Sequence, residues 1–99
     1  MKELIEKLNK VFDSRMRLGV MSALSVNDSL DFNALKIMLD ATDGNLASHI
    51  AALEEEGYVK VTKKFVGRKP RTTYAMTAIG RKSFSDHIAA LEKLIRSSQ

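Results

Sequence analysis

The stretch that decides the fold of this chain is TDGNLASHIAALEEEGYVKVTKKFVGRKPRTTY, residues 42–74. In its first half Leu46, Ile50 and Leu53 recur at spacings of four and three residues, which predicts one apolar stripe along an amphipathic helix. The threonine that opens the stretch is a preferred helix cap, and Gly57 suits a helix end. The sequence therefore predicts a helix of about four turns whose other faces are small and polar.

After this helix the apolar period changes from helical to extended. Residues 58–66 are rich in β-branched and aromatic side chains, and residues 72–76 form a second run of the same kind. Residues 67–71 between them contain the turn formers glycine and proline. We therefore predict a β-hairpin whose turn spans residues 67–71, with Pro70 stiffening its tip.

The predicted hairpin is also the basic part of the chain. Residues 60–73 contain six cations and no acidic residue, whereas the whole chain has a formal net charge of only +4. The remainder is therefore net acidic, and the basic character is local. A local basic patch indicates a polyanionic partner such as nucleic acid. The six cations are Lys60, Lys63, Lys64, Arg68, Lys69 and Arg71.

Length and composition limit the class of protein. With 99 residues, 44% hydrophobic and 28% charged, the chain is expected to form a single globular domain over residues 1–99. The absence of cysteine excludes disulfides and thiolate chemistry. No apolar run is long enough to cross a membrane and no signal-peptide core is present, so a cytoplasmic location without a membrane partner is expected. No nucleophile is paired with a base, and we expect no enzymatic activity and no cofactor.

Further helices are predicted on both sides of the opening stretch. They cover Lys2 to Phe12, Arg15 to Leu24, Phe32 to Leu39 after an Asp31 cap, and residues 78–97 after a Thr77 cap. The helix that ends at Leu39 is separated by about three residues from the helix that begins after Thr42, which is the spacing of a helix-turn-helix. With the basic hairpin attached, the sequence predicts an α+β winged helix-turn-helix: a three-helix core with a two-stranded wing.

The first and last predicted helices, within residues 1–12 and 78–97, have apolar seams. Those seams are either part of the protomer core or surface that a second copy covers, and we expect a homodimer. A twofold dimer would present two recognition helices roughly 34 Å apart and would prefer a pseudo-palindromic operator. The residues expected at the dimer interface are Leu4, Leu8, Phe12, Phe84, Ile88, Leu91 and Ile95.

Four segments, taken together and in order, resemble the small winged-helix transcriptional regulators, close to the MarR and ArsR types. They are Thr42–Ile50, Leu53–Val59, Lys64–Thr72 and Thr77–Arg81, and the resemblance extends over essentially the whole chain. It implies that the end helices pair in a homodimer, that the recognition helix lies in the major groove of double-stranded DNA, and that the wing grips the backbone or the minor groove. It also implies repression as the commoner mode of regulation.

Two departures from these types matter. An ArsR-type metal sensor would be expected to have cysteines or clustered His, Asp and Glu ligands, whereas this chain has only His49 and His87, far apart in sequence. No metal site is therefore expected. MarR-type proteins are usually longer, with extra helices that form a ligand cleft, so the sequence leaves a small-molecule effector open.

The residues expected to contact DNA lie on the recognition helix and the wing. An amide can read adenine, a hydroxyl or imidazole can serve several acceptors, and cations can contact phosphate. The alternatives are plain solvated surface and a winged-helix protein-interaction module that uses the basic hairpin against an acidic partner. RNA binding is less favoured, because Phe65 and Tyr74 are the hairpin's only aromatic residues besides its first, Tyr58. The expected DNA contacts are Thr42, Gly44, Asn45, Ser48 and His49, with Lys63, Lys64, Arg68, Lys69, Arg71 and Thr73.

Overall fold

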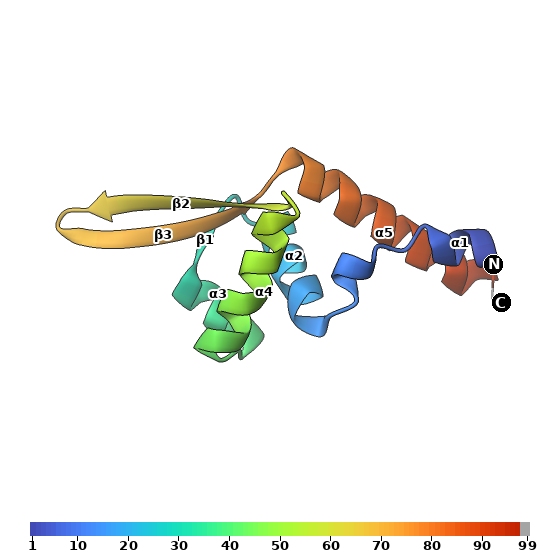
Figure 1. The fold of residues 1–99 in the computed structure, drawn as a ribbon, viewed down its shortest axis with the longest axis horizontal. Coiled ribbons are helices and arrows are strands. Elements are labelled where there is room, and N and C mark those ends of the chain that lie inside the picture. The colour runs from blue at the N-terminus through green and yellow to red at the C-terminus, as the bar shows by residue number, and fades with distance from the viewer. Residues whose placement is uncertain (98–99) are drawn as a thin grey trace.

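The computed structural model describes residues 1–97 and shows a helical body with a hairpin projecting from one end and a helical arm from the other (Figure 1). Its extents are 55 × 25 × 21 Å, and the described chain both begins and ends at the far end of the arm. Over the described residues, no helix is long and apolar enough to span a membrane. In chain order the elements are α1 (Lys2–Glu6), the 3-10 turn η1 (Lys10–Phe12), α2 (Arg15–Ser25), β1 (Leu30–Asp31), α3 (Phe32–Leu39), α4 (Asp43–Glu55), β2 (Val59–Val66), β3 (Lys69–Met76) and α5 (Ala78–Ser97).

Helices α3 and α4 form the predicted helix-turn-helix, and side-chain caps define both starts. The carboxylate of Asp31 accepts a 2.8 Å hydrogen bond from the backbone of Ala34, and Thr42 Oγ1 accepts one of 3.3 Å from Asn45. Asp40, at φ 49°, turns the chain between the two helices in a left-handed conformation. The predicted caps and the tight turn are thus confirmed.

The core lies between α2, α3 and α4. Leu46, Ile50 and Leu53 are buried, as the spacing in the sequence predicts, and they belong to the same cluster as Met21 of α2 and Leu35 of α3. Each fully buried side chain of this size contributes about 1.5–3 kcal/mol. This packing holds α4 by one face and leaves its opposite face to solvent.

The sheet differs from the prediction in two respects. A short strand, β1, joins the hairpin, and the strand order is β1-β3-β2. The hairpin closes on a two-residue turn, Gly67-Arg68, because pairing continues to Val66 opposite Lys69; the predicted five-residue turn is wrong. Gly67 has φ +65°, the conformation that such short hairpin turns require. Pro70 therefore lies within β3, beyond the reach of β1, where its missing N–H costs no ladder hydrogen bond.

The predicted single helix from Lys2 to Phe12 is also wrong, because Asn9 interrupts it. The Asn9 side chain accepts a 3.0 Å bond from the backbone of Val11 and donates one of 3.0 Å to the hydroxyl of Tyr58. These bonds replace the continuing helical pattern, so α1 ends early and η1 follows. Phe12 then turns inward and is only 1% exposed.

One junction connects the body to the arm. The Thr77 hydroxyl donates a 2.6 Å hydrogen bond to the carbonyl of Gly57 and accepts one of 2.9 Å from the backbone of Gly80. The predicted Thr77 cap is confirmed. A Cβ atom at Gly80 would lie 2.2 Å from the carbonyl oxygen of Tyr58, so only glycine permits this approach. The start of α5 is therefore held against the end of α4 and the base of β2.

Candidate nucleic-acid interface

The free face of α4 has small side chains along most of its length and the acidic Glu55 at its C-terminal end. Gly44, Ala47, Ser48 and Ala51 are exposed there, opposite the buried stripe. Every residue from Asp43 to Glu55 is described by the structure, and none of them is lysine or arginine. A smooth helix face of this kind can enter a groove deeply, and it leaves positive charge to other elements.

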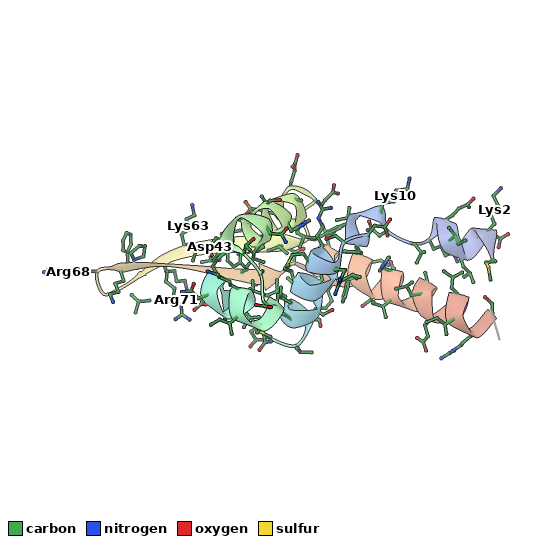
Figure 2. All side chains as sticks on the ribbon, turned by 90° about the horizontal axis from the view of Figure 1, so that it is seen from below. Lys2, Lys10, Asp43, Lys63, Arg68 and Arg71 are labelled. Carbon is green, nitrogen blue, oxygen red and sulfur yellow. The ribbon has the colours of Figure 1, made fainter. Side chains whose placement is uncertain are left out.

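The wing, defined as β2 and β3 with their turn (residues 59–76), supplies that charge beside α4. Side chains alternate between the faces of a strand, and partners across the ladder share a face. Lys63 and its partner Thr72 therefore lie on the face toward α4, and Arg71 lies on the other. In Figure 2, Lys63 and Arg71 project to opposite sides of the wing, with Arg68 at its tip. Of the cations in β2 and β3, both fully described, only Lys63 lies on the face toward α4.

The structure thus divides the basic residues of the wing, which form one run in the sequence, between two faces. Lys60, Lys64, Lys69 and Arg71 share the face away from α4, together with Thr73. Arg71 Nη2 also lies 3.6 Å from a carboxylate oxygen of Asp31, which places this cation at the edge of the helix-turn-helix. Because both side chains are substantially exposed, the pair adds little to stability.

A groove separates α4 from the wing. It is lined by Ala47, Ala51 and Glu54 of α4 and by Lys63, Thr72 and Tyr74 of the wing. Burial, and then the Glu54 carboxylate, raise the pKa of the Tyr74 phenol above its ordinary value. Tyr74 is therefore a neutral hydrogen-bond donor at physiological pH, half-buried at the floor of the groove.

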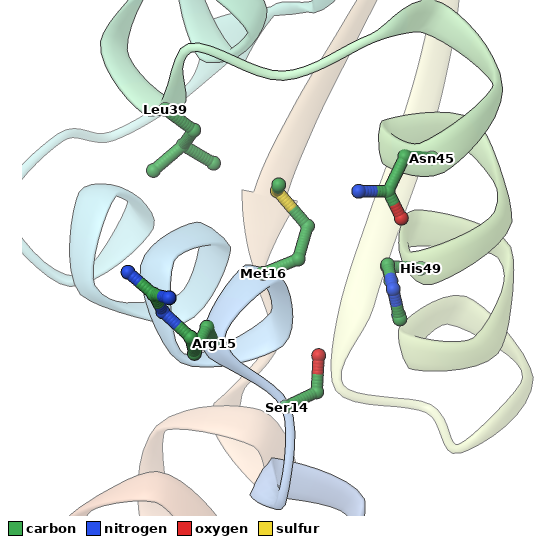
Figure 3. Close-up of a pocket in the computed structure, with 6 residues that line it drawn as sticks. All are labelled: Ser14, Arg15, Met16, Leu39, Asn45 and His49. Carbon is green, nitrogen blue, oxygen red and sulfur yellow. The ribbon is translucent and has the colours of Figure 1, made fainter.

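The structure directs two of the predicted α4 contacts elsewhere. Asn45 and His49 point from α4 toward α2, where they line a hollow with Ser14, Arg15, Met16 and Leu39 (Figure 3). Arg17 Nε donates a 3.1 Å hydrogen bond to Nδ1 of His49. The bonded nitrogen is an acceptor, so Nε2 carries the proton. His49 is half-buried and is separated from the exposed face that carries Ser48.

Sequence reasoning missed the α2 residues of this hollow. Arg15 is exposed beside Asn45, and Arg17 also donates a 3.3 Å bond to the carbonyl of Val11. No local pattern in the sequence could have found them, because they precede α4 by almost thirty residues. Only the packing of α2 against α4 brings them to the site.

The start of α4 is tied to α3 as well. Lys36 Nζ lies 2.7 Å from a carboxylate oxygen of Asp43, and the hydroxyl of Thr42 is engaged as the helix cap. At Gly44, by contrast, an added Cβ atom would meet nothing within 4 Å. Gly44 is therefore dispensable for packing, and its missing side chain lets a phosphate approach the helix start, where Thr42 already accepts the N–H of Asn45.

Among residues 1–97, the structure gathers no group of three or more His, Cys, Asp or Glu side chains that could hold a metal ion. His49 and His87 lie on different elements, α4 and α5.

Comparison with known proteins agrees with this geometry. The family described as "Winged helix DNA-binding domain" matches residues 16–95. An uncharacterized protein of Methanocaldococcus jannaschii is 33% identical over 88 residues, which cover 89% of this chain and 96% of that protein. A solved transcriptional regulator homologue from Pyrococcus horikoshii OT3 is 32% identical with a TM-score of 0.90, over 100% of this chain and 99% of that one.

A MarR-family transcriptional regulator from Silicibacter pomeroyi shares the fold at lower identity. It is 18% identical with a TM-score of 0.67, over 92% of this chain and 63% of that one. The family match extends from α2 to α5, which includes the helix-turn-helix, the wing and most of the arm. The predicted winged-helix class is confirmed, and this chain belongs to the winged helix DNA-binding domain family.

Proposed function

We propose that this protein is a homodimeric transcriptional regulator that binds double-stranded DNA by sequence. The observation that carries the proposal is the placement of a smooth, exposed face of α4 directly beside a wing with six cations and no acidic residue between residues 60 and 73. In this arrangement the cation-free face of α4 would meet base edges, while the neighbouring cations neutralise phosphates. Base contacts by α4 together with phosphate contacts by the wing would let a winged helix bind DNA with sequence preference.

The proposed contacts follow from this placement. On α4, Gly44 and Ser48 enter the major groove, and Thr42 lies at the helix start near the backbone. Asn45 and His49 lie at the flank toward α2, where the free Nε2–H of His49 donates to a phosphate or base edge. On the wing the proposed contacts are Lys63, Lys64, Arg68, Lys69, Arg71 and Thr73.

The dimer is proposed on the shape of the protomer. Its radius of gyration is 15.0 Å, against about 13 Å for a compact chain of this length. Its accessible surface is 6900 Å², about a fifth more than the roughly 5,600 Å² of a compact monomer of 11.0 kDa. The excess is consistent with an arm that a second copy covers. On this proposal residues 1–99 form one DNA-binding domain, and the segments at residues 1–12 and 78–97 form its dimer contact.

The residues proposed for the interface change in one respect. Ile88 and Ile95 are exposed along α5, and Ile5 of α1, the helix that contacts α5 on the arm, is 55% exposed. Leu4, Leu8, Phe84 and Leu91 are half-buried and form the edge of the same seam. Phe12 is withdrawn, because it packs in the protomer core with ring centroids 5.4 Å from Phe84 and 5.2 Å from His87.

A twofold dimer of this kind would favour a pseudo-palindromic operator with half-sites about one DNA turn, roughly 34 Å, apart. Binding over a promoter would block transcription, so we propose a repressor that acts in the cytoplasm. The test is fluorescence anisotropy with a duplex from the gene's own upstream region and an unrelated duplex, at about 50 and 200 mM salt.

Binding of the upstream duplex at least ~10³-fold more tightly than the unrelated one supports the proposal. Equal, steeply salt-dependent binding of both would contradict sequence-specific regulation from this region. No binding to either duplex would instead favour the protein-interaction module with an acidic partner.

A further inference from the structure

Near its tip the wing exposes apolar surface that the DNA contacts above do not explain. Phe65 is 77% exposed and Val66 is 59% exposed. Phe65 lies directly across the ladder from Pro70, so the two rings share one face of the wing. Lys63 and Thr72 precede them on that same face, which is the face toward α4. The face of the wing that lines the α4 groove therefore continues toward the tip, where it carries a phenylalanine ring beside a proline ring.

The protomer makes no use of this pair in its core. The hairpin extends well beyond α4 and β1, and Phe65 is absent from the hydrophobic cluster of the described chain (Figure 1). Among the described residues Phe65 is the only aromatic side chain that is exposed, and Pro70 and the exposed Val66 extend the apolar surface around the end of the hairpin. Its rigid setting, with a two-residue turn and a proline partner, preserves its orientation.

We propose that Phe65, supported by Pro70, is a wedge that the wing inserts between base pairs in the minor groove, so that the protein bends its operator. The inference rests on the proposed DNA-binding function and adds a mechanical activity to it. Apolar side chains that enter the minor groove unstack a base step and kink the duplex by roughly 20–90°. Here the kink would occur beside the site where α4 reads the major groove.

Charge identifies DNA as the occupant of this face. Lys63 and Lys64 immediately precede Phe65, Arg68 lies at the tip, and no acidic residue occurs from residue 60 to 73. A polyanion is drawn to such a surface, whereas a second copy of this chain would bring a wing of the same sign. The apolar wedge and the cations are thus adjacent, so the cations can contact the two phosphate backbones that border the minor groove while the wedge enters it.

The experiment uses the full-length protein and a duplex that the wild-type protein enriches from a random library. Donor and acceptor dyes on the two duplex ends report bending as a rise in energy transfer on binding. We expect the rise with wild-type protein, its loss by at least about half with Phe65→Ala, and its retention with Phe65→Leu, which keeps an apolar wedge. Val66→Ala is the matched control, because Val66 is also exposed but lies on the opposite face; this variant should bend DNA like the wild type.

A second readout separates a wedge from a phosphate contact. Phe65→Ala should leave the slope of log affinity against log salt unchanged, since it removes no charge. The inference is overturned if wild-type protein binds the duplex without a rise in energy transfer, if Phe65→Ala bends it equally, or if Val66→Ala loses the bend as well. In each of these cases DNA binding itself persists, so the proposed function stands. Failure to enrich any duplex would overturn both.

Discussion

The backbone N–H of Asn9 donates a 2.9 Å hydrogen bond to Nδ1 of His87, joining residues 78 positions apart. Asn9 also bonds to Tyr58, which directly precedes β2, so one residue connects the N-terminal segment, α5 and the start of the hairpin. His87 is 4% exposed and lies against the ring of Phe12. Because Nδ1 accepts a hydrogen bond from a backbone N–H here, it cannot itself carry a proton, and the bond exists only when the imidazole is neutral.

The first prediction concerns acid stability. Burial lowers the pKa of His87, and the nearby Asp13 carboxylate opposes this only in part. Since the unfolded chain then binds the proton more readily, the contribution of neutral His87 is complete above about pH 6.5 and declines as the pH falls through the lower, folded pKa. We expect the free energy of unfolding, measured by urea titration, to decrease as the pH falls below about 6.5.

His87→Asn is the informative comparison for that measurement. The Asn Oδ1 atom can accept the same backbone bond, but it does not titrate. The variant should therefore show a weaker decrease below about pH 6.5, because the remaining titratable groups are the same in both proteins. An unchanged pH profile would show that His87 protonation is not the cause.

The second prediction concerns the packing of α5 on Tyr58. Gly80→Ala would bring its Cβ atom to 2.2 Å from a backbone carbonyl, so the helix must shift. We expect a loss of about 1–3 kcal/mol in the free energy of unfolding, although alanine is the better helix former. Gly44→Ala is the control, since its Cβ atom meets nothing; it should be neutral or stabilising by up to about 1 kcal/mol. Equal effects of the two substitutions on the urea midpoint would refute this account.

The third prediction concerns wing charge. Lys64→Ala and Arg68→Ala should each weaken DNA binding to all sequences alike and lower the slope of log affinity against log salt by about 0.9 for each phosphate that is no longer neutralised. Lys2→Ala, at the far end of the arm (Figure 2), should leave both quantities unchanged. Anisotropy titrations over a salt series measure the slope. A slope that falls equally with Lys2→Ala would point to nonspecific charge effects.

The fourth prediction concerns base readout by α4. Because α4 has no lysine or arginine, it lacks the usual guanine-reading contact, whereas exposed Ala47 and Ala51 suit thymine methyl groups. Replacing thymines of an enriched duplex with deoxyuridine should weaken binding by roughly fourfold for each methyl contact of about 0.8 kcal/mol. Ala51→Gly should reduce that sensitivity, and Ala89→Gly on α5 controls for the helical cost of glycine. Enriched duplexes that tolerate deoxyuridine throughout would contradict this readout.

The fifth prediction concerns assembly. A charge placed in the exposed seam of α5 by Ile88→Glu or Ile95→Glu should convert a dimer to a monomer, because an unpaired carboxylate would be buried at the interface. Sedimentation equilibrium gives the mass. Val26→Glu is the control, since Val26 is 81% exposed and directly follows α2, outside the proposed seam of α5. A wild-type monomer at micromolar concentration, or a dimer that tolerates both substitutions, would remove α5 from the interface.

The sequence by itself determined the elements that depend on neighbours in the chain. Asp31, Thr42 and Thr77 cap helices by bonds to residues three positions ahead, and the stripe of α4 follows from the helical repeat. The hairpin also follows from local composition, and with these elements in order the winged-helix class could be predicted. Its turn length could not, because residues 67–71 are compatible with more than one register, and pairing as far as Val66 and Lys69 selected one.

Only the tertiary structure decided how the site is arranged. The sequence places six cations in one run, but strand alternation assigns Lys63 to the α4 face and Arg71 to the other. It places His49 next to Ser48, but packing turns His49 to Arg17 on α2. These relationships depend on contacts between residues distant in sequence, such as the bond from Asn9 to His87. The free energy that selects them comes from burial and pairing across elements, and no local pattern encodes it.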